Sequence, residues 1–269
     1  MSDGLFIKQD EHVFLPSDSA VGPWNPGLLH GGATAGLIAY VLEKHEPEAN
    51  KQYSRITLDM FRPVPKEALT VSARTVRAGK KISVVEVSVM ADGKEVAKAT
   101  ALKIQKATLG VPDYVQLPAC SFALPDTLES LSMMGARHSS ADKSKLPAGL
   151  NYTLEVKRID GFDGKGKGRA WFKAPVPVVA GQPITPLTHL GVLSDFGNGL
   201  AQLFIPGTAG SINADISLYI NRLPQGEWVG LESQAVMSDA GIGRVSTTLY
   251  DERGAIGCVE QMTMAQLMA

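Results

Sequence analysis

The pattern of hydrophobic and polar positions predicts antiparallel strands on both sides of one helix-forming stretch. Alternation of the kind seen in half-buried strands is clearest at residues 68–77 and 82–90. The predicted strands of this part of the chain are residues 6–14, 53–61, 68–77, 82–90 and 95–104. Asp92 and Gly93 favour a tight hairpin turn between the last two. The expected order is therefore a strand, a helix and a meander of four strands.

A buried helix is predicted over residues 31–42. Large apolar side chains occupy one face of it, at Leu37, Ile38, Val41 and Leu42. Gly31 and Gly32 stand at its start, where they allow another backbone to come close. The first amides of a helix lack partners within the helix and lie at the positive end of its dipole. The start of this helix is therefore a candidate site for an anion or a developing oxyanion.

The same order recurs in the second part of the chain. A constant offset of 160 positions relates the pairs Pro26 and Pro186, Gly31 and Gly191, Leu58 and Leu218, Arg62 and Arg222, and Glu67 and Glu227. Strand-like segments follow at residues 151–158 and 167–173, and the counterpart of the predicted helix spans residues 191–202. We infer an internal duplication rather than the chance likeness of two unrelated domains. The predicted divisions are an N-terminal repeat at residues 1–105, a linker at 106–149 and a C-terminal repeat at 150–269.

Composition narrows the class of protein. The chain has 269 residues, of which 44% are hydrophobic, and this is enough for a substantial core. A net charge of −1 without a basic cluster gives no sign of a nucleic-acid partner. Neither a signal peptide nor an apolar run of membrane-spanning length is present, so we expect a cytoplasmic protein without membrane insertion. Cys120 and Cys258 are far apart and lack metal-ligand spacing, so we expect neither a disulfide framework nor a metal site.

A long helix wrapped by an antiparallel sheet, present twice in one chain, is the pattern of the double hotdog, an α+β fold. The sequence resembles the TesB-like acyl-CoA thioesterases. The residues that carry this resemblance are Leu29-His30-Gly31-Gly32, Leu193-Ser194-Asp195-Phe196, residues 211–219 with Arg222, and Val259-Glu260-Gln261. The resemblance implies hydrolysis of a fatty acyl-CoA to the free acid and CoA.

The resemblance also implies which residues hold the attacking water. In that family an Asp on the second helix, a Thr on the next strand and a Gln on the last strand share this task. By residue, these positions fall on Asp195, Asn213 and Gln261, so this chain has asparagine where the family has threonine. We expect no cofactor, because coenzyme A is part of the substrate.

Chemistry gives an independent reason to single out these residues. Thioester hydrolysis needs an activated water, a donor for the oxyanion and a slot for the acyl chain. Asp195 aligns with Ala35 of the first repeat, so one repeat alone carries a carboxylate here and we expect one active site. The amides of Asn213 and Gln261 can orient water.

The start of the first helix supplies the other candidates. We expect the Gly31 and Gly32 amides to face the thioester carbonyl, with His30 beside them as an oxyanion or substrate-binding residue. A simpler interpretation is that His30 is a loop residue bonded to a carbonyl. Likewise, Asp195 could belong to a solvated helical stripe with Asn198 and Gln202.

Two other function classes share the fold. One is a hydratase or dehydratase acting on acyl thioesters, because residues 24–30 weakly resemble the Asn-Pro approach to a histidine in that family. The acidic residue that should precede this asparagine is absent. The other is an acyl-CoA sensor without catalysis. For each class we expect a homodimer, because a double hotdog leaves sheet surface to be covered.

Overall fold

The predicted strands form, and they join into one sheet. A computed structural model describes residues 4–132 and 149–268, and in these ranges fourteen strands make a single antiparallel sheet. The N-terminal part contains β1 (Phe6–Lys8), β2 (Val13–Pro16), α1 (Gly31–Lys44), β3 (Lys51–Met60), β4 (Leu69–Arg77), β5 (Ile82–Ala91) and β6 (Lys94–Gln105).

The C-terminal part repeats this arrangement beside the first. It contains β7 (Leu131–Ser132), α3 (Leu150–Thr153), β8 (Glu155–Asp160), β9 (Lys167–Lys173), α4 (Pro186–Leu193), α5 (Gly197–Leu200), β10 (Thr208–Asn213), β11 (Asp215–Ile220), β12 (Val229–Met237), β13 (Ile242–Asp251) and β14 (Gly254–Leu267). The strand order is β1-β2-β4-β5-β6-β3-β11-β14-β13-β12-β9-β8-β7, and β10 pairs with β14. Residues 133–148 of the predicted linker lie outside the described residues.

The offset of 160 reappears in the sheet. β12 starts and ends 160 residues after β4, and β13 does the same relative to β5. Where β3 and β11 pair and join the two parts, Thr57 lies opposite Ser217, its own counterpart at that offset. A residue faces its equivalent in this way beside a twofold axis. The two parts are therefore related by a pseudo-twofold axis between β3 and β11.

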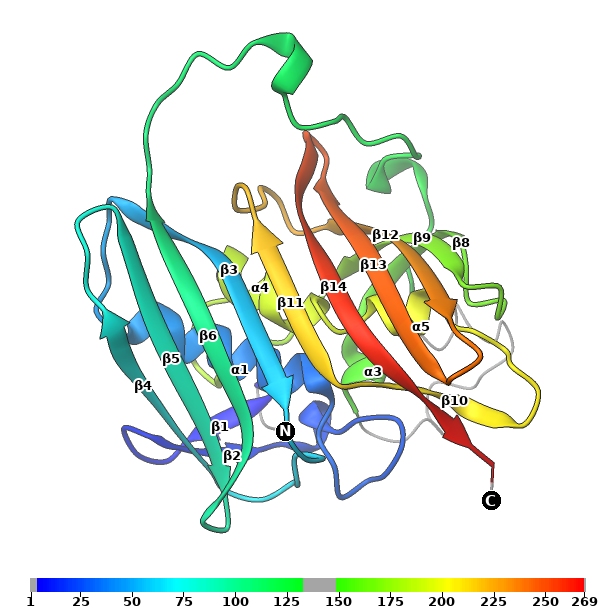
Figure 1. Cartoon of the computed structure of the whole chain (residues 1–269), viewed down its shortest axis with the longest axis horizontal. Helices are drawn as coiled ribbons and strands as arrows, with labels where there is room; N and C mark the ends of the chain where they lie inside the picture. The colour runs from blue at the N-terminus through cyan, green and yellow to red at the C-terminus, as the bar shows by residue number, and fades with distance from the viewer. Residues whose placement is uncertain (1–3, 133–148, 269) are drawn as a thin grey trace.

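Two helices cross on the inner face of the sheet (Figure 1). They pack closely because glycines stand at the crossing between α1 and α4. A Cβ atom on Gly32 would lie 2.4 Å from the carbonyl oxygen of Val192, and one on Gly36 would lie 2.7 Å from the Val192 side chain. The main hydrophobic core is continuous across both parts of the chain. No helix in the described ranges is long and apolar enough to cross a membrane.

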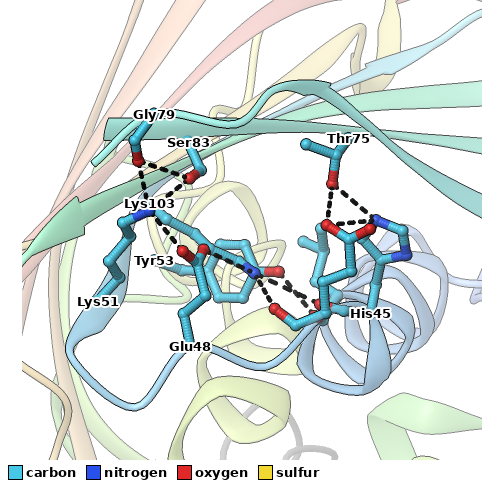
Figure 2. A network of polar contacts seen from close by, with 10 residues as sticks. His45, Glu48, Lys51, Tyr53, Thr75, Gly79, Ser83 and Lys103 are labelled. Atoms are coloured by element: carbon cyan, nitrogen blue, oxygen red, sulfur yellow. Dashed lines mark hydrogen bonds and ion pairs between the residues drawn. The ribbon is translucent and has the colours of Figure 1, made fainter. Parts of the chain in front are cut away.

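The C-terminal end of α1 is fixed to the sheet by a polar network (Figure 2). The Tyr53 hydroxyl donates to the Leu42 carbonyl at 2.7 Å, and the Lys103 ammonium donates to the Glu46 carbonyl just after the helix at 2.8 Å. The ammonium groups of Lys51 and Lys103 both pair with Glu48. The hydrogen bond from Lys51 lowers the pKa of the Glu48 carboxyl, and burial works against this shift. These contacts fix the C-terminal end of α1 to the sheet.

The second helix differs from the prediction. It begins at Pro186, where Thr185 and Thr188 form a capping box, and it is interrupted at residues 194–196 before α5. Glycine is a weak helix former, and the Ser194 hydroxyl bonds to the Gly191 carbonyl and so competes with the helical pattern. Asp195 therefore lies in a break between two helices rather than near the start of one.

The first predicted strand of each repeat also differs from the prediction. The predicted strand at residues 6–14 is a hairpin of two short strands, β1 and β2. Residues 151–153, predicted as the start of a strand, belong to the short helix α3.

Candidate active site

The break between α4 and α5 places Asp195 against the start of α1. The carboxylate is 9% exposed, and its Oδ2 accepts a hydrogen bond from the Gly32 N–H at 3.0 Å. A Cβ atom on Gly31 would lie only 2.7 Å from the same oxygen. The glycine pair is therefore required for close approach of the carboxylate to the helix start, where the positive end of the helix dipole stabilises its charge.

His30 caps α1 and binds the same carboxylate. Its Nδ1 lies 2.8 Å from Asp195 Oδ2 and 3.0 Å from the Gly32 nitrogen. A bare Nδ1 at this distance would oppose its lone pair to a carboxylate oxygen, so we assign the proton to Nδ1, which then donates to Asp195. A protonated Nδ1 does not accept from the Gly32 N–H, so His30 is the N-cap residue of α1 by position, and the Gly32 N–H is left to the carboxylate. The ring stacks on Phe196 with centroids 4.6 Å apart. His30 and Asp195 thus form a buried dyad, and the expectation that His30 bonds to a carbonyl is replaced by this contact.

Two side-chain amides bind the other carboxylate oxygen. Asn213 Nδ2 donates to Asp195 Oδ1 at 2.6 Å, and Gln261 Nε2 does so at 3.3 Å. Asn198 Nδ2 donates to Asn213 Oδ1 at 3.0 Å, which fixes the orientation of the Asn213 amide. Gln261 is fully buried, and its Oε1 has no hydrogen-bond partner among the described residues. With Gly32 and His30, four donors surround Asp195.

The structure brings all the predicted site residues together. It also changes what can be expected of the two glycine amides. The Gly32 N–H is used by Asp195, whereas the Gly31 N–H has no hydrogen-bond partner in the described part of the chain. Asp195 is too buried to belong to a solvated helical stripe.

Two pockets meet at Asp195. One, of about 320 Å³, has both polar and apolar walls and is called the polar pocket because it is the more polar of the two; its lining includes His30, Asn151, Asn198, Gln202 and Ser211. The other, of about 420 Å³, is called the apolar pocket; its lining includes Leu28, Met60, Phe61, Ile212 and Met264. Both are also lined by Trp24, Gly31 and Asp195. The carboxylate therefore lies where a polar and an apolar part of one ligand would join.

Sequence reasoning did not place Asn151, Trp24 and Asn198 at the site, where the structure shows them lining the polar pocket. Trp24 reaches from the loop before α1 to β10, where a Cβ atom on Gly210 would lie 3.2 Å from its ring. Asn198 follows Asp195 by three residues, and this helical spacing was the one indication in the sequence that the two side chains lie on the same side. The sequence alone does not show whether that side is exposed to solvent or buried at a site.

Neither cysteine lines the polar or the apolar pocket. Burial raises the pKa of both the Cys120 and the Cys258 thiol, which disfavours the reactive thiolate. In the residues that the structure describes, no group of three or more His, Cys, Asp or Glu side chains is placed to hold a metal ion.

This fold, with one carboxylate site between two repeats, defines a double-hotdog protein. Residues 20–104 match the family model of the acyl-CoA thioesterase N-terminal domain, and residues 125–265 match that of the C-terminal domain. The chain belongs to the acyl-CoA thioesterase family and is a thioester hydrolase.

Solved structures share the fold over nearly the whole chain. An acyl-CoA thioesterase II, TesB2, from Mycobacterium marinum has a TM-score of 0.66 at 14% identity, with 98% of this chain and 96% of that chain covered. A conserved protein of unknown function with a hotdog fold from Alicyclobacillus acidocaldarius has a TM-score of 0.69 at 17% identity, with 99% and 98% covered. At these identities the likeness concerns the fold alone. A search of curated proteins finds no match to this chain.

Proposed function

We propose that this protein hydrolyses a fatty acyl-CoA to the free acid and CoA, with Asp195 as the general base. The observation that supports this most is the position of Asp195, a buried carboxylate held by four donors at the junction of a polar and an apolar pocket. A fixed carboxylate beside a carbonyl can take the proton of an attacking water. The apolar pocket suits the acyl chain.

The attacking water would bind on the Gln261 side of the carboxylate. Two carboxylate oxygens offer about four acceptor positions, and the contact from Gln261 is the longest of the four, at 3.3 Å. A water there would donate to Asp195 Oδ1 and accept from Gln261 Nε2. Asn213, held by Asn198, keeps the carboxylate in position.

The reaction then needs two proton transfers. The water oxygen attacks the thioester carbon while its proton passes to Asp195, and the Gly31 N–H donates to the resulting oxyanion. Collapse of this intermediate breaks the carbon–sulfur bond, and the leaving thiolate takes the proton from Asp195. His30 stabilises the carboxylate through its Nδ1–H throughout. These steps require no covalent enzyme intermediate and no cofactor besides the CoA of the substrate.

Thiol release from a panel of acyl-CoA substrates tests this function. We expect release by the parental protein with fatty acyl-CoA, and a large loss in Asp195→Asn. An acyl-CoA sensor would instead bind these compounds without releasing thiol, and a hydratase would hydrate an enoyl-CoA with its thioester intact. Either result would refute the proposal.

We also propose that the protein is a cytoplasmic homodimer. Apolar side chains are exposed on the strands, among them Tyr219, Val236 and Ile242 at 43%, 48% and 59%. Burial of such side chains between two copies is favourable. Light scattering that finds only monomer at micromolar concentration would refute the dimer.

A further inference from the structure

One buried polar side chain at the polar pocket has no partner. Asn151 is 6% exposed, and its Oδ1 has no hydrogen-bond partner in the ranges that the structure describes. The residue lines the polar pocket together with His30 and Asp195. A buried amide oxygen without a partner is unfavourable for folding. A ligand group that pairs with it would explain why the residue is polar.

Asn151 is held in a fixed relation to the catalytic dyad. The N–H of Leu150, its neighbour in α3, donates to the Val21 carbonyl at 2.9 Å. The N–H of His30 donates to the Ala20 carbonyl, also at 2.9 Å. The same short segment, residues 20–21, therefore anchors both α3 and the start of α1. A ligand held by Asn151 would have a defined position relative to His30 and Asp195.

The two pockets suggest which part of the substrate Asn151 contacts. An acyl-CoA has an apolar chain on one side of the thioester and, on the other, an arm that carries secondary amides. A side-chain amide offers one acceptor and two donors, which complement the N–H and C=O of a secondary amide. Rotation about the Cβ–Cγ bond is soft for asparagine, so either end of the amide can turn to the ligand.

We propose that Asn151 binds an amide of the substrate's thiol arm in the polar pocket, while the acyl chain lies in the apolar pocket. This inference rests on the proposed function and adds the recognition of the thiol arm to it. Asn151 takes no part in proton transfer, so its effect is on binding.

Thr34 provides a matched control. It is fully buried in α1, and its hydroxyl also has no hydrogen-bond partner among the described residues. Thr34 lines neither the polar nor the apolar pocket. Thr34→Val replaces an unpaired hydroxyl, and Asn151→Leu replaces an amide whose oxygen is unpaired, each by an apolar group of similar shape. Both variants should therefore melt at or above the parental temperature.

The experiment compares two thioesters of the same acid: the acyl-CoA, and an S-ethyl thioester that has no amide. In Asn151→Leu we expect KM for the acyl-CoA to rise about tenfold, as for the loss of one or two neutral hydrogen bonds, with KM for the S-ethyl thioester and kcat nearly unchanged. Thr34→Val should leave all four values unchanged. Asn151→Ala, which introduces no new contact, should show the same split if Asn151→Leu folds poorly.

An equal change in KM for both thioesters, or no change for either, would overturn the role of Asn151. If the parental protein releases no thiol from either thioester, the proposed function fails instead. In that case calorimetry with pantetheine decides the inference separately, because Asn151→Leu should weaken pantetheine binding about tenfold. Equal affinity of the two proteins for pantetheine would again overturn it.

Discussion

Replacement of Asp195 by asparagine keeps the shape of the side chain and removes its charge. The carboxylate accepts from Gly32 and His30 on one oxygen and from Asn213 and Gln261 on the other. An asparagine can keep its carbonyl oxygen toward the Gly32 N–H, which cannot turn away. Its NH2 group then faces the two side-chain amides. The Gln261 amide can rotate to present its unpartnered oxygen, whereas the Asn213 amide is held by Asn198 and loses its hydrogen bond.

The contacts of Asp195 allow the effects of this substitution on the free energy of unfolding and on kcat to be worked out. A hydrogen bond to a charged group contributes about 1.5–3 kcal/mol and a neutral one about 0.5–1.5 kcal/mol, so four contacts lose several kcal/mol between them. The removal of a buried charge offsets much of this loss. We therefore expect a net change in unfolding free energy of less than about 2 kcal/mol. The loss of the general base should lower kcat by about a hundredfold to ten-thousandfold.

The assay is thiol release from an acyl-CoA at saturating concentration, with urea unfolding and calorimetric acyl-CoA binding measured on the same preparation. The expected result is a large loss of kcat with near-parental stability and affinity. Retention of kcat within about threefold of the parental value would show that Asp195 does not activate the water. Equal losses of kcat and of folded protein would show that the residue has a structural role instead.

Three other substitutions test separate parts of the structure. Gln261→Ala should lower kcat by less than Asp195→Asn, because a neutral amide orients the water without taking its proton; an equal loss in a thiol-release assay would contradict this. His189 Nε2 accepts the Ala174 N–H, and burial lowers the pKa of His189 to about 4. A histidine in the unfolded chain has a pKa near 6.5. The contribution of His189 to the free energy of unfolding is therefore complete above about pH 6.5, and the free energy falls by about 3 kcal/mol as the pH drops to about 4. His189→Gln should flatten this part of the curve of urea stability against pH, and an unchanged slope would refute the assignment. Gly32→Ala places a methyl group against the Val192 carbonyl, so it should lower the melting temperature and separate α1 from α4; a parental melting temperature would show that the crossing is loosely packed.

The sequence was sufficient to predict the elements and their repetition. Alternating side chains predicted β4, β5 and β6 to within a residue or two, because an antiparallel strand with one buried face has this period in any fold. The offset of 160, applied to the predicted strands at residues 68–77 and 82–90, gives residues 228–237 and 242–250, where β12 and β13 lie. Asp195 could be selected because its counterpart in the first repeat, Ala35, has no carboxylate.

Only the tertiary structure decided how the site is assembled. The bond from Gly32 to Asp195 joins residues 163 positions apart, and it exists because two helices cross at glycines. The helix break that places Asp195 and the unpartnered amide of Asn151 also depend on these packed surfaces. The local sequence pattern shows which face of a helix or strand is apolar, because the buried face of each element must be apolar whatever element it packs against. Which polar groups meet is set by the packing of elements distant in sequence, and no local period contains that information.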